Sequence, residues 1–538
     1  MSASAPPPAE SLRIAIAQIA SIVGDIAGNA AKIRRARDEA GLQGADLVVF
    51  PELCLSGAPL QDLALNPAFQ QCCRREVEAL AAESADGPAL LLGTPWREGT
   101  ALHNAVVLLD GGAICAVRFK VDLVTDGPFG ETHLFTAGPH PGPVSLKGVR
   151  IGVPVGTDIA GGDVAECLAE TGAELLIVPS ASPYHRAVYD VRANHAVARV
   201  VETDLPLLYV NAVGGQEGVV CDGASFALNA DRFLAMQFPN FQDRVRMTQW
   251  ERFSNGWRCT QAPSADRLDG LQADYAACVR AVRDHAAQSG TTQALVDLSA
   301  GLESAVSAAI AVDALGPDHV RGLILRPSAP QHQLRDAAET SGTLGIQCDT
   351  LESTPLAEAL AEALSPLHTQ PASRIEDAGE RVRGVLRAAA ADLRKALLIC
   401  TAPRTALMVG AHGCDARAER AFAPLSDVDP IDVAAFARLR NGWKPVGSLG
   451  PDGVVIPEHL VDPPDDPAPA ILSRLSAPGA SVATVVAEGF EGTLVAHLAD
   501  QLYRSEARRE ALPGVALTQR ALGRPRHMPP RHLFRDDG

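Results

Sequence analysis

The 538-residue chain is poor in aromatic side chains, which make up 4% of it, although 47% of its residues are hydrophobic. Apolar volume supplied mainly by Ala, Val and Leu disfavours an aromatic-rich β-sandwich and favours α/β layers. Basic residues are not in excess either, because the formal net charge is −17. This acidic balance disfavours wholesale binding to nucleic acid or to anionic lipid, so we expect a small molecule or another protein as the partner.

Long apolar runs and paired cysteine motifs are also missing. No run of roughly 18 apolar residues occurs, and the start, "MSASAPPPAESLR", has no apolar segment of the kind found in signal peptides. The 11 cysteines are scattered, and none forms a CxxC pair. We therefore expect a cytoplasmic protein without a membrane segment, in which most thiols are small core residues.

The length predicts more than one domain. From residue 10 to 245, short apolar runs alternate with amphipathic stretches, which predicts a layered α/β domain. Residues 246–268 break this periodicity and are interpreted as a linker. A second α/β domain is expected over 269–538, because "QALVDLS" and "SAVSAAIAVDALG" predict a strand, a glycine-containing turn and a helix, an order typical of phosphate binding. Residues 450–480 are expected to form a loop.

Three charged residues are expected at strand ends of the first domain: Glu52 in "VVFPELCLSG", Lys120 in "VRFKVDL" and Glu131 in "GPFGETHLF". A fourth position, Gly156 in "RIGVPVGTDIAGGD", lies at a strand-to-turn elbow of the kind that mounts a nucleophile in many α/β enzymes. Together they resemble the nitrilase superfamily, which uses a Glu as general base, a Lys to stabilise the oxyanion, a second Glu for orientation and a Cys nucleophile.

A closer resemblance is to the glutaminase half of glutamine-dependent NAD+ synthetases. It is carried by "FPELCLSGAPLQDL", "FKVDLVTDGPFGETHLF" and "LLYVNAVGGQEGVVCDGASF", and it covers nearly the whole first domain. The resemblance implies a nitrilase-like α-β-β-α sandwich in which Glu52, Lys120 and Glu131 converge on the backbone at Gly156. The family's cysteine belongs at Gly156, so no thioester can form there. Cys54 follows Glu52 on the same strand end and is a poor substitute.

The resemblance also implies three contacts to the glutamine substrate. At Asp126 the family has a tyrosine, and at Val188, downstream of Ser182, it has a Lys or Arg that binds the substrate carboxylate. The added acid would repel the α-carboxylate of glutamine, and the removed cation would no longer attract it. These two departures, like Gly156, therefore argue against glutaminase activity.

The second domain resembles the synthetase half of the same family over "VDLSAGLESAVSAAIAVDALGPDHVRGLILRPS". This implies a Rossmann-like fold of the adenine nucleotide alpha hydrolase type, whose SGGxDS loop holds ATP pyrophosphate and Mg2+. The equivalent positions here are Ser299, Ala300, Gly301, Glu303 and Ser304. Ala300 adds a methyl group to the loop and Glu303 is a longer, weak candidate for the metal ligand.

Farther along, "LLICTAPRTALMVGAHGCDARAERAFAPLSDV" resembles a region in which the family carries Asn, Lys, a metal-binding Glu and a phosphate-contacting Lys. Only Arg404 and Asp415 retain related chemistry, and Ser426 replaces the last lysine. The family's glutamate-containing loop has no counterpart in "VDPPDDPAPAIL".

These departures leave three readings open. The first is a pseudoenzyme that keeps the fold and acts in a homo-oligomer, or in a hetero-oligomer with an active paralogue. The second is an NAD+ synthetase that uses free ammonia, with ATP and Mg2+ held by Glu303, Arg404 and Asp415. The third is a small ligand bound beside Gly156, although an ion-paired cluster that stabilises the fold explains the same charged residues.

Overall fold

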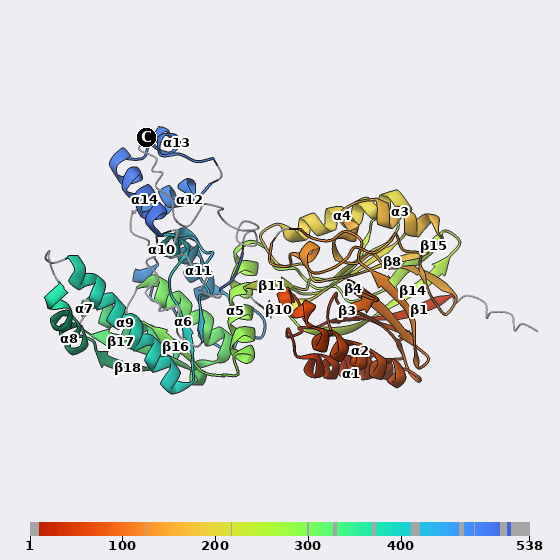
Figure 1. Ribbon diagram of the computed structural model, residues 1–538, viewed down its shortest axis with the longest axis horizontal. Coiled ribbons are helices and arrows are strands. Elements are labelled where there is room, and N and C mark those ends of the chain that lie inside the picture. The colour runs from red at the N-terminus through yellow and green to blue at the C-terminus, as the bar shows by residue number, and fades with distance from the viewer. Residues whose placement is uncertain are drawn as a thin grey trace, which may run out of the picture. The chain divides into compact units, whose positions relative to one another are not determined.

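The computed structural model describes residues 10–125, 127–216, 218–298, 301–326, 331–367, 373–409, 420–461, 467–477, 479–505 and 514–517. The chain forms two compact units, Met1–Leu268 and Asp269–Gly538. Each unit has its own sheets and its own core, and each is described by itself (Figure 1).

The described part of the first unit has four α-helices: α1 (Ile26–Leu42), α2 (Pro67–Glu83), α3 (Asp163–Glu170) and α4 (Val188–Thr203). Its strands are β1 (Ser11–Gln18), β2 (Leu47–Val49), β3 (Ala89–Glu98), β4 (Ala101–Asp110), β5 (Ala113–Phe119), β6 (Val144–Leu146), β7 (Val149–Gly152), β8 (Leu175–Ser180), β9 (Leu207–Asn211), β10 (Val213–Gln216), β11 (Val219–Asp222), β12 (Phe226–Leu228), β13 (Leu234–Gln237), β14 (Arg244–Phe253) and β15 (Gly256–Gln261).

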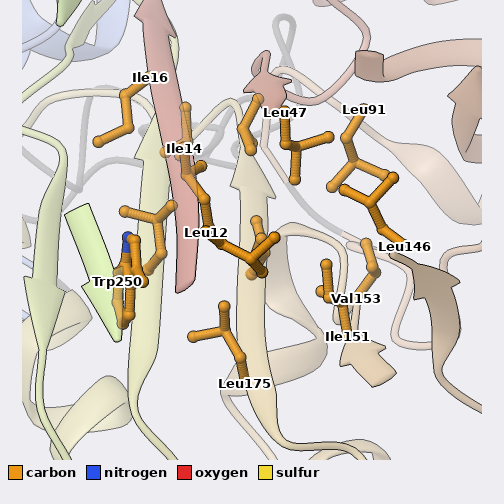
Figure 2. Close-up of a cluster of buried hydrophobic side chains, with 14 of the residues drawn as sticks. Leu12, Ile14, Ile16, Leu47, Leu91, Leu146, Ile151, Val153, Leu175 and Trp250 are labelled. Atoms are coloured by element: carbon orange, nitrogen blue, oxygen red, sulfur yellow. The ribbon is translucent and has the colours of Figure 1, made fainter. Parts of the chain in front are cut away.

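Two mixed sheets face each other in this unit. One has seven strands in the order β15-β14-β1-β2-β3-β4-β5, and the other has six in the order β13-β12-β9-β8-β7-β6. Strand β1 shows how the sequence builds the layers, because successive side chains of a strand point to opposite faces. Leu12, Ile14 and Ile16 enter the core between the two sheets (Figure 2), whereas Ala15 and Ala17 face a second core shared with α1 and α2.

Helices cover the outer face of each sheet. Residues of α1 and α2 pack on the seven-stranded sheet, and residues of α3 and α4 pack on the six-stranded sheet. Figure 1 shows the two helix pairs on opposite sides of the strands. The unit is therefore the α-β-β-α sandwich that the sequence predicts.

The interpretation of residues 246–268 as a linker is wrong for most of that stretch. Strand β14 pairs antiparallel with β1 over its length, and β15 pairs with β14. Thr248 and Trp250 are buried, and the Trp250 ring lies in the core between the sheets. "RVRMTQWERF" alternates between two faces, but its polar residues mask the period-2 pattern that identifies a strand.

The second unit has the helices α5 (Gly270–Gln288), α6 (Leu302–Leu315), α7 (Gln331–Leu344), α8 (Thr354–Leu364), α9 (Ser373–Arg394), α10 (Arg404–Met408), α11 (Pro430–Gly442), α12 (Ala468–Leu475), α13 (Val482–Ala487) and α14 (Gly492–Ser505) in its described part. Its strands are β16 (Ala294–Asp297), β17 (Val320–Arg326), β18 (Gln347–Glu352), β19 (Leu397–Ile399) and β20 (Ala421–Phe422).

These five strands form a parallel sheet in the order β18-β17-β16-β19-β20. From β16 the chain first adds β17 and β18 on one side of the sheet and then returns to add β19 and β20 on the other side. The carboxyl end of β16 therefore lies at a topological switch point. Ligands of open α/β sheets bind at such points. This is the Rossmann-like arrangement expected from the sequence, with the turn after β16 leading into α6.

A separate small core joins α12, α13 and α14, with Leu472, Val485 and Leu498 among its buried residues. Part of the stretch 450–480 is therefore helical and not a loop throughout, because Ile471, Leu472 and Leu475 of α12 supply an apolar face to this core. Among the helices of the described residues, none combines the length and the apolar character needed to cross a membrane.

Candidate functional site

The first candidate site lies just beyond the ends of strands β2 and β5 and beside strand β4, which runs between β3 and β5 in the sheet. Glu52 follows β2 and is 6% exposed. Strand β3 runs so close to it that a Cβ added to Gly93 would lie 2.2 Å from the Leu53 backbone nitrogen and 2.7 Å from the Glu52 Cα. Only glycine fits this approach, and it holds the backbone of Glu52 against the sheet.

Glu52, Lys120 and Glu131 meet in a buried cluster. The Lys120 Nζ lies 2.8 Å from Glu52 Oε1 and 2.7 Å from Glu131 Oε2, and the lysine is 3% exposed. Burial by itself lowers the pKa of Lys120, but the charges of the two carboxylates outweigh it and raise that pKa. Lys120 is thus held as an ammonium ion between two acids.

Asn104 completes the cluster and is fully buried. Its Nδ2 donates to Glu52 Oε1 at 2.8 Å and to Glu131 Oε1 at 2.7 Å, and its backbone oxygen accepts from the Lys120 N–H at 2.9 Å. A single lysine cannot supply donors to every oxygen of two carboxylates. The amide group of Asn104 therefore adds a donor to the Oε1 atom of each carboxylate, while backbone N–H groups of Ala181 and Val124 donate to the Oε2 atoms.

Gly156 opens a short 3-10 turn, Gly156–Ile159, after β7. Its φ is +53°, which side chains rarely adopt. A Cβ built on it would lie 2.5 Å from Glu52 Oε2, and that oxygen accepts from the Ala181 N–H at 3.0 Å. Any side chain at 156 would therefore contact the Glu52 carboxylate, which would have to shift.

Asp158, in the same turn, ties the elbow to the chain that follows Lys120. Its Oδ1 accepts from the N–H groups of Val121 at 3.0 Å and Asp122 at 2.8 Å, and its Oδ2 accepts from Val155 at 2.9 Å. Burial raises the pKa of Asp158 to about 6, against the lowering effect of these hydrogen bonds. These hydrogen bonds of Asp158 hold the turn at Gly156 next to the segment that follows Lys120.

The thiol of Cys54 does not replace the missing nucleophile. Its Sγ donates to the Gly93 carbonyl oxygen at 3.6 Å, and the residue belongs to the core beneath α1 and α2. Burial raises the pKa of Cys54 to about 12. A thiol that stays protonated at neutral pH is a weak nucleophile.

Of the three residues expected to contact substrate, Asp126 lies outside the described residues. The Ser182 N–H donates to Asn211 Oδ1 at 2.9 Å, one residue beyond the Ala181 N–H that binds Glu52. Val188 is 6% exposed and begins α4. Its apolar side chain offers no group that could bind a carboxylate.

The second candidate site is the turn between β16 and α6, where Ser299 and Ala300 lie outside the described residues. Gly301 has φ +79°, and a Cβ added to it would meet nothing within 4 Å. The Ser304 hydroxyl donates to the Gly301 carbonyl oxygen at 2.8 Å. Burial raises the pKa of Glu303.

In the second unit, two of the residues predicted to contact phosphate, Arg404 and Ser426, contact other residues of the protein. Arg404 lies 3.9 Å from Asp427 and 3.6 Å from Asp429, and the Ser426 hydroxyl donates to the Val515 carbonyl oxygen at 3.2 Å. Asp415 lies outside the described residues. Within the described ranges, no group of three or more His, Cys, Asp and Glu side chains could hold a metal ion.

Asn104 and Asp158 were not predicted as site residues. Each is a polar residue inside an otherwise apolar stretch, "LHNAVVLLD" and "GVPVGTDIAG". A buried polar residue needs hydrogen-bond partners, so this interruption is the signal that identifies such positions. Their partners depend on how distant strands come together.

Comparisons with known proteins agree with this architecture. A carbon-nitrogen hydrolase family model matches residues 13–249, and an NAD synthase family model matches residues 274–465. A glutamine-dependent NAD(+) synthetase from Rhodobacter capsulatus is 37% identical over 97% of this chain and 99% of its own length. One from Xylella fastidiosa is 32% identical over 98% of this chain and 99% of its own length.

Solved structures are similar over nearly the whole chain as well. The glutamine-dependent NAD+ synthetase from Acinetobacter baumannii, in complex with adenosine diphosphate, superposes with a TM-score of 0.76 at 26% identity, covering 96% of this chain and 98% of that one. One from Cytophaga hutchinsonii has a TM-score of 0.79 at 18% identity and covers 96% and 97%, a likeness of fold.

Proposed function

The chain belongs to the glutamine-dependent NAD(+) synthetase family, and within that family we propose that it is a pseudoenzyme. It lacks glutaminase activity, its ATP-dependent amidation of deamido-NAD is impaired, and it acts as a regulatory or structural partner. One observation carries the proposal: the Glu52 carboxylate stands 2.5 Å from where a Cβ at residue 156 would be.

Glutamine hydrolysis in this family is expected to need a thiolate, a free general base and an anchor for the substrate carboxylate. Gly156 provides no thiolate and Val188 no anchor. Glu52 is not free either, because it accepts hydrogen bonds from Lys120, Asn104 and the Ala181 N–H. Losing the covalent route removes the step that divides a difficult hydrolysis into two easier ones. Lys120 and Glu131 then serve to keep the buried charges paired.

Impairment of the synthetase half is supported by the neighbours of its expected phosphate contacts. Arg404 faces two aspartates, so a phosphate would have to compete with Asp427 and Asp429 for its guanidinium. Ser426 contributes no charge where the family resemblance implies a lysine. Both changes weaken the stabilisation of negative charge on transferring phosphoryl groups.

The role proposed for the chain rests on its fold, since both of its sites are proposed to be impaired. We propose that it assembles in the cytoplasm with copies of itself or with an active paralogue, and that it acts in this assembly as a regulatory or structural partner. Retention of the complete two-unit fold, at 37% identity over 97% of the chain to one synthetase, supports a selected role for the fold.

An NAD+ synthetase that uses free ammonia is the second candidate. It is favoured by the open space at Gly301, where a Cβ would meet nothing within 4 Å, and by the switch point at the carboxyl end of β16. In that case Glu303, Arg404 and Asp415 would hold ATP and Mg2+, and the first unit would be bypassed.

Activity assays with the purified full chain separate these alternatives. The protein is incubated with deamido-NAD, ATP and Mg2+, with either glutamine or ammonium as the nitrogen donor, and both NAD+ and glutamate are measured. We expect neither product. NAD+ formed with ammonium alone would establish the second candidate. Glutamate release from glutamine at about 1 per second, an ordinary enzymatic rate, would overturn both.

A further inference from the structure

A buried ion pair lies at the carboxyl end of β16 in the second unit. Asp297 is the last residue of β16 and is 5% exposed. The Nε of Arg387, a residue of α9, lies 2.5 Å from Asp297 Oδ2, and the Arg387 side chain is 12% exposed. Two opposite charges are thus held together where little water reaches them.

The periods of the strand and the helix explain why these two side chains meet. Leu295 and Asp297 are two residues apart on β16, so they point to the same face of the sheet. Ala391 and Arg387 are four residues apart on α9, so they share a face of the helix. Leu295 and Ala391 pack in one apolar core. Asp297 and Arg387 form the next layer of contacts, toward the carboxyl end of the strand.

This charged layer lies where open α/β sheets bind their ligands. Strand β16 is the strand at the topological switch point, and the chain runs from Asp297 through a turn into α6. Anions are favoured where a strand leads through a turn to the start of a helix. A carboxylate fixed there repels an anion, and it also engages the Arg387 guanidinium, a group well suited to bind phosphate.

Packing alone does not require charges in this layer. Leu295, Leu323 and Leu398 fill the same face of the sheet with apolar side chains. Well-packed apolar residues of similar volume are often at least as stabilising as a buried ion pair. The choice of an acid and an arginine beside the switch point therefore bears on ligand binding more than on stability.

We propose that Asp297 is an internal competitor for anions. Its carboxylate holds the Arg387 guanidinium that a polyphosphate at the carboxyl end of β16 would otherwise engage, and its charge repels that ligand. This inference rests on the proposed impairment of the synthetase half and deepens it, because it adds a contact within the second unit that disfavours ligands with adjacent phosphate groups.

Isothermal titration of the purified full chain with inorganic tripolyphosphate tests the proposal, at constant ionic strength and without Mg2+. Asp297→Asn keeps the shape of the side chain and removes its charge. We expect Asp297→Asn to bind tripolyphosphate at least tenfold more tightly than the wild type, a difference of about 1.4 kcal/mol. The double variant Asp297→Asn, Arg387→Gln should lose this gain, because the guanidinium is the group that receives the anion.

The matched control is Asp349→Asn. Asp349 lies on the edge strand β18 at the same level of the sheet as Asp297, since both residues pair with Leu323 of β17. It also contacts an arginine, with Arg321 Nε 3.0 Å from its Oδ2. The substitution changes the net charge by the same amount, but β18 does not lead into α6. We therefore expect no gain in tripolyphosphate binding.

Several results would overturn the proposal. Equal affinity in the wild type and Asp297→Asn, or no binding by Asp297→Asn, would show that Asp297 does not compete with anions. An equal gain in Asp349→Asn would reduce the effect to net charge. Undiminished binding in the double variant would show that Arg387 does not receive the anion.

Thermal unfolding keeps the test valid if Asp297→Asn folds poorly. The substitution removes a counter-charge from the buried Arg387, which lowers stability, so Asp297→Ser is prepared as a second variant. Tripolyphosphate should raise the melting temperature of either variant by a few degrees and leave that of the wild type unchanged, because a ligand stabilises only the form that binds it. Absence of such a shift would contradict the proposal.

The unmodified protein supplies a further check. Tight tripolyphosphate binding by the wild type that is lost in Arg387→Gln would mean that Asp297 does not block the arginine, and it would overturn the proposal. None of these readouts measures NAD+ or glutamate. A failure here is therefore distinguishable from a failure of the proposed function, which the activity assays decide.

Discussion

The two candidate sites of this protein differ in how their polar groups are held. In the first unit, Lys120 lies 2.8 Å and 2.7 Å from two carboxylates, and all three charged residues are buried. In the second, Arg404 stands 3.9 Å and 3.6 Å from its aspartates, and Ser304 bonds within its own turn. The first set is mutually dependent, while the second consists of separate local contacts.

This difference gives a physical reason for the sequence interpretation, in which the charged residues that the resemblance implies are present in the first unit and altered in the second. Removing one member of a buried ion cluster leaves an unpaired charge, which costs several kcal/mol whether or not the site is catalytic. Replacing a residue with loose or local contacts costs much less. The cost of breaking this cluster is a reason to retain Glu52, Lys120 and Glu131 whether or not the site is catalytic. Their presence alone is weak evidence of activity.

The largest effect should come from breaking the buried cluster. Lys120→Met leaves Glu52 and Glu131 without a counter-charge and should lower the free energy of unfolding of the first unit by about 3–5 kcal/mol. Arg404→Met in the second unit should cost less than Lys120→Met, because its contacts with Asp427 and Asp429 are longer, at 3.9 Å and 3.6 Å. Both are measured by urea denaturation. Similar losses in the two variants would mean that the two sites do not differ in the way described.

Asp158 should make the stability of the first unit depend on pH. Its folded-state pKa of about 6 is above the ordinary value of 3.8, so the ionised form is disfavoured by folding. Relative to Asp158→Asn, the wild type should therefore lose about 3 kcal/mol of stability as the pH rises from below 4 to above 6, at 1.36 kcal/mol per pKa unit. Unfolding of both proteins across this range measures the difference, and a constant difference would contradict the role of burial.

Glycine substitutions compare the two turns directly. Gly156→Ala should cost about 2–3 kcal/mol, because it combines a strained positive φ with a Cβ that meets Glu52. Gly301→Ala should cost about 1–2 kcal/mol, since its backbone (φ +79°, ψ −140°) is strained for a side chain but the space around the Cβ is open. Thermal unfolding of both variants measures the gap. If Gly301→Ala is the costlier change, the Glu52 contact does not control the turn at 156.

Gly156→Cys is the companion variant, and it should not release glutamate from glutamine. Its side chain would have to displace the Glu52 carboxylate, and Val188 still offers no carboxylate anchor. Full recovery of glutaminase activity would show that the missing thiol is the sole defect.

The smallest effect is expected at Ser304. Its hydroxyl donates only to Gly301 in the described structure, so Ser304→Ala should lower stability by about 0.5–1 kcal/mol. Melting of the second unit measures the change, with Ser307→Ala as a control whose buried hydroxyl has no partner. A loss above about 2 kcal/mol would indicate that the second site is as interdependent as the first.

Much of the fold was predictable because apolar periodicity is local. The alternation in β1, the helix over Ile26–Leu42 and the β16–turn–α6 order all follow from neighbouring residues. Strand β14 was not recognised, since its half-buried residues alternate with arginines and its partner β1 is far away in sequence. A linker and a polar edge strand have similar compositions until the pairing is known.

The sequence by itself determined the chemistry that is missing: a glycine at 156 carries no thiol, and a valine at 188 carries no charge. Only the tertiary structure decided which groups lie beside Gly156, because Glu52, Asn104, Lys120 and Ala181 come from separate strands and loops. Hydrogen bonds and ion pairs act over a few ångströms, so the arrangement of a site depends on long-range chain packing.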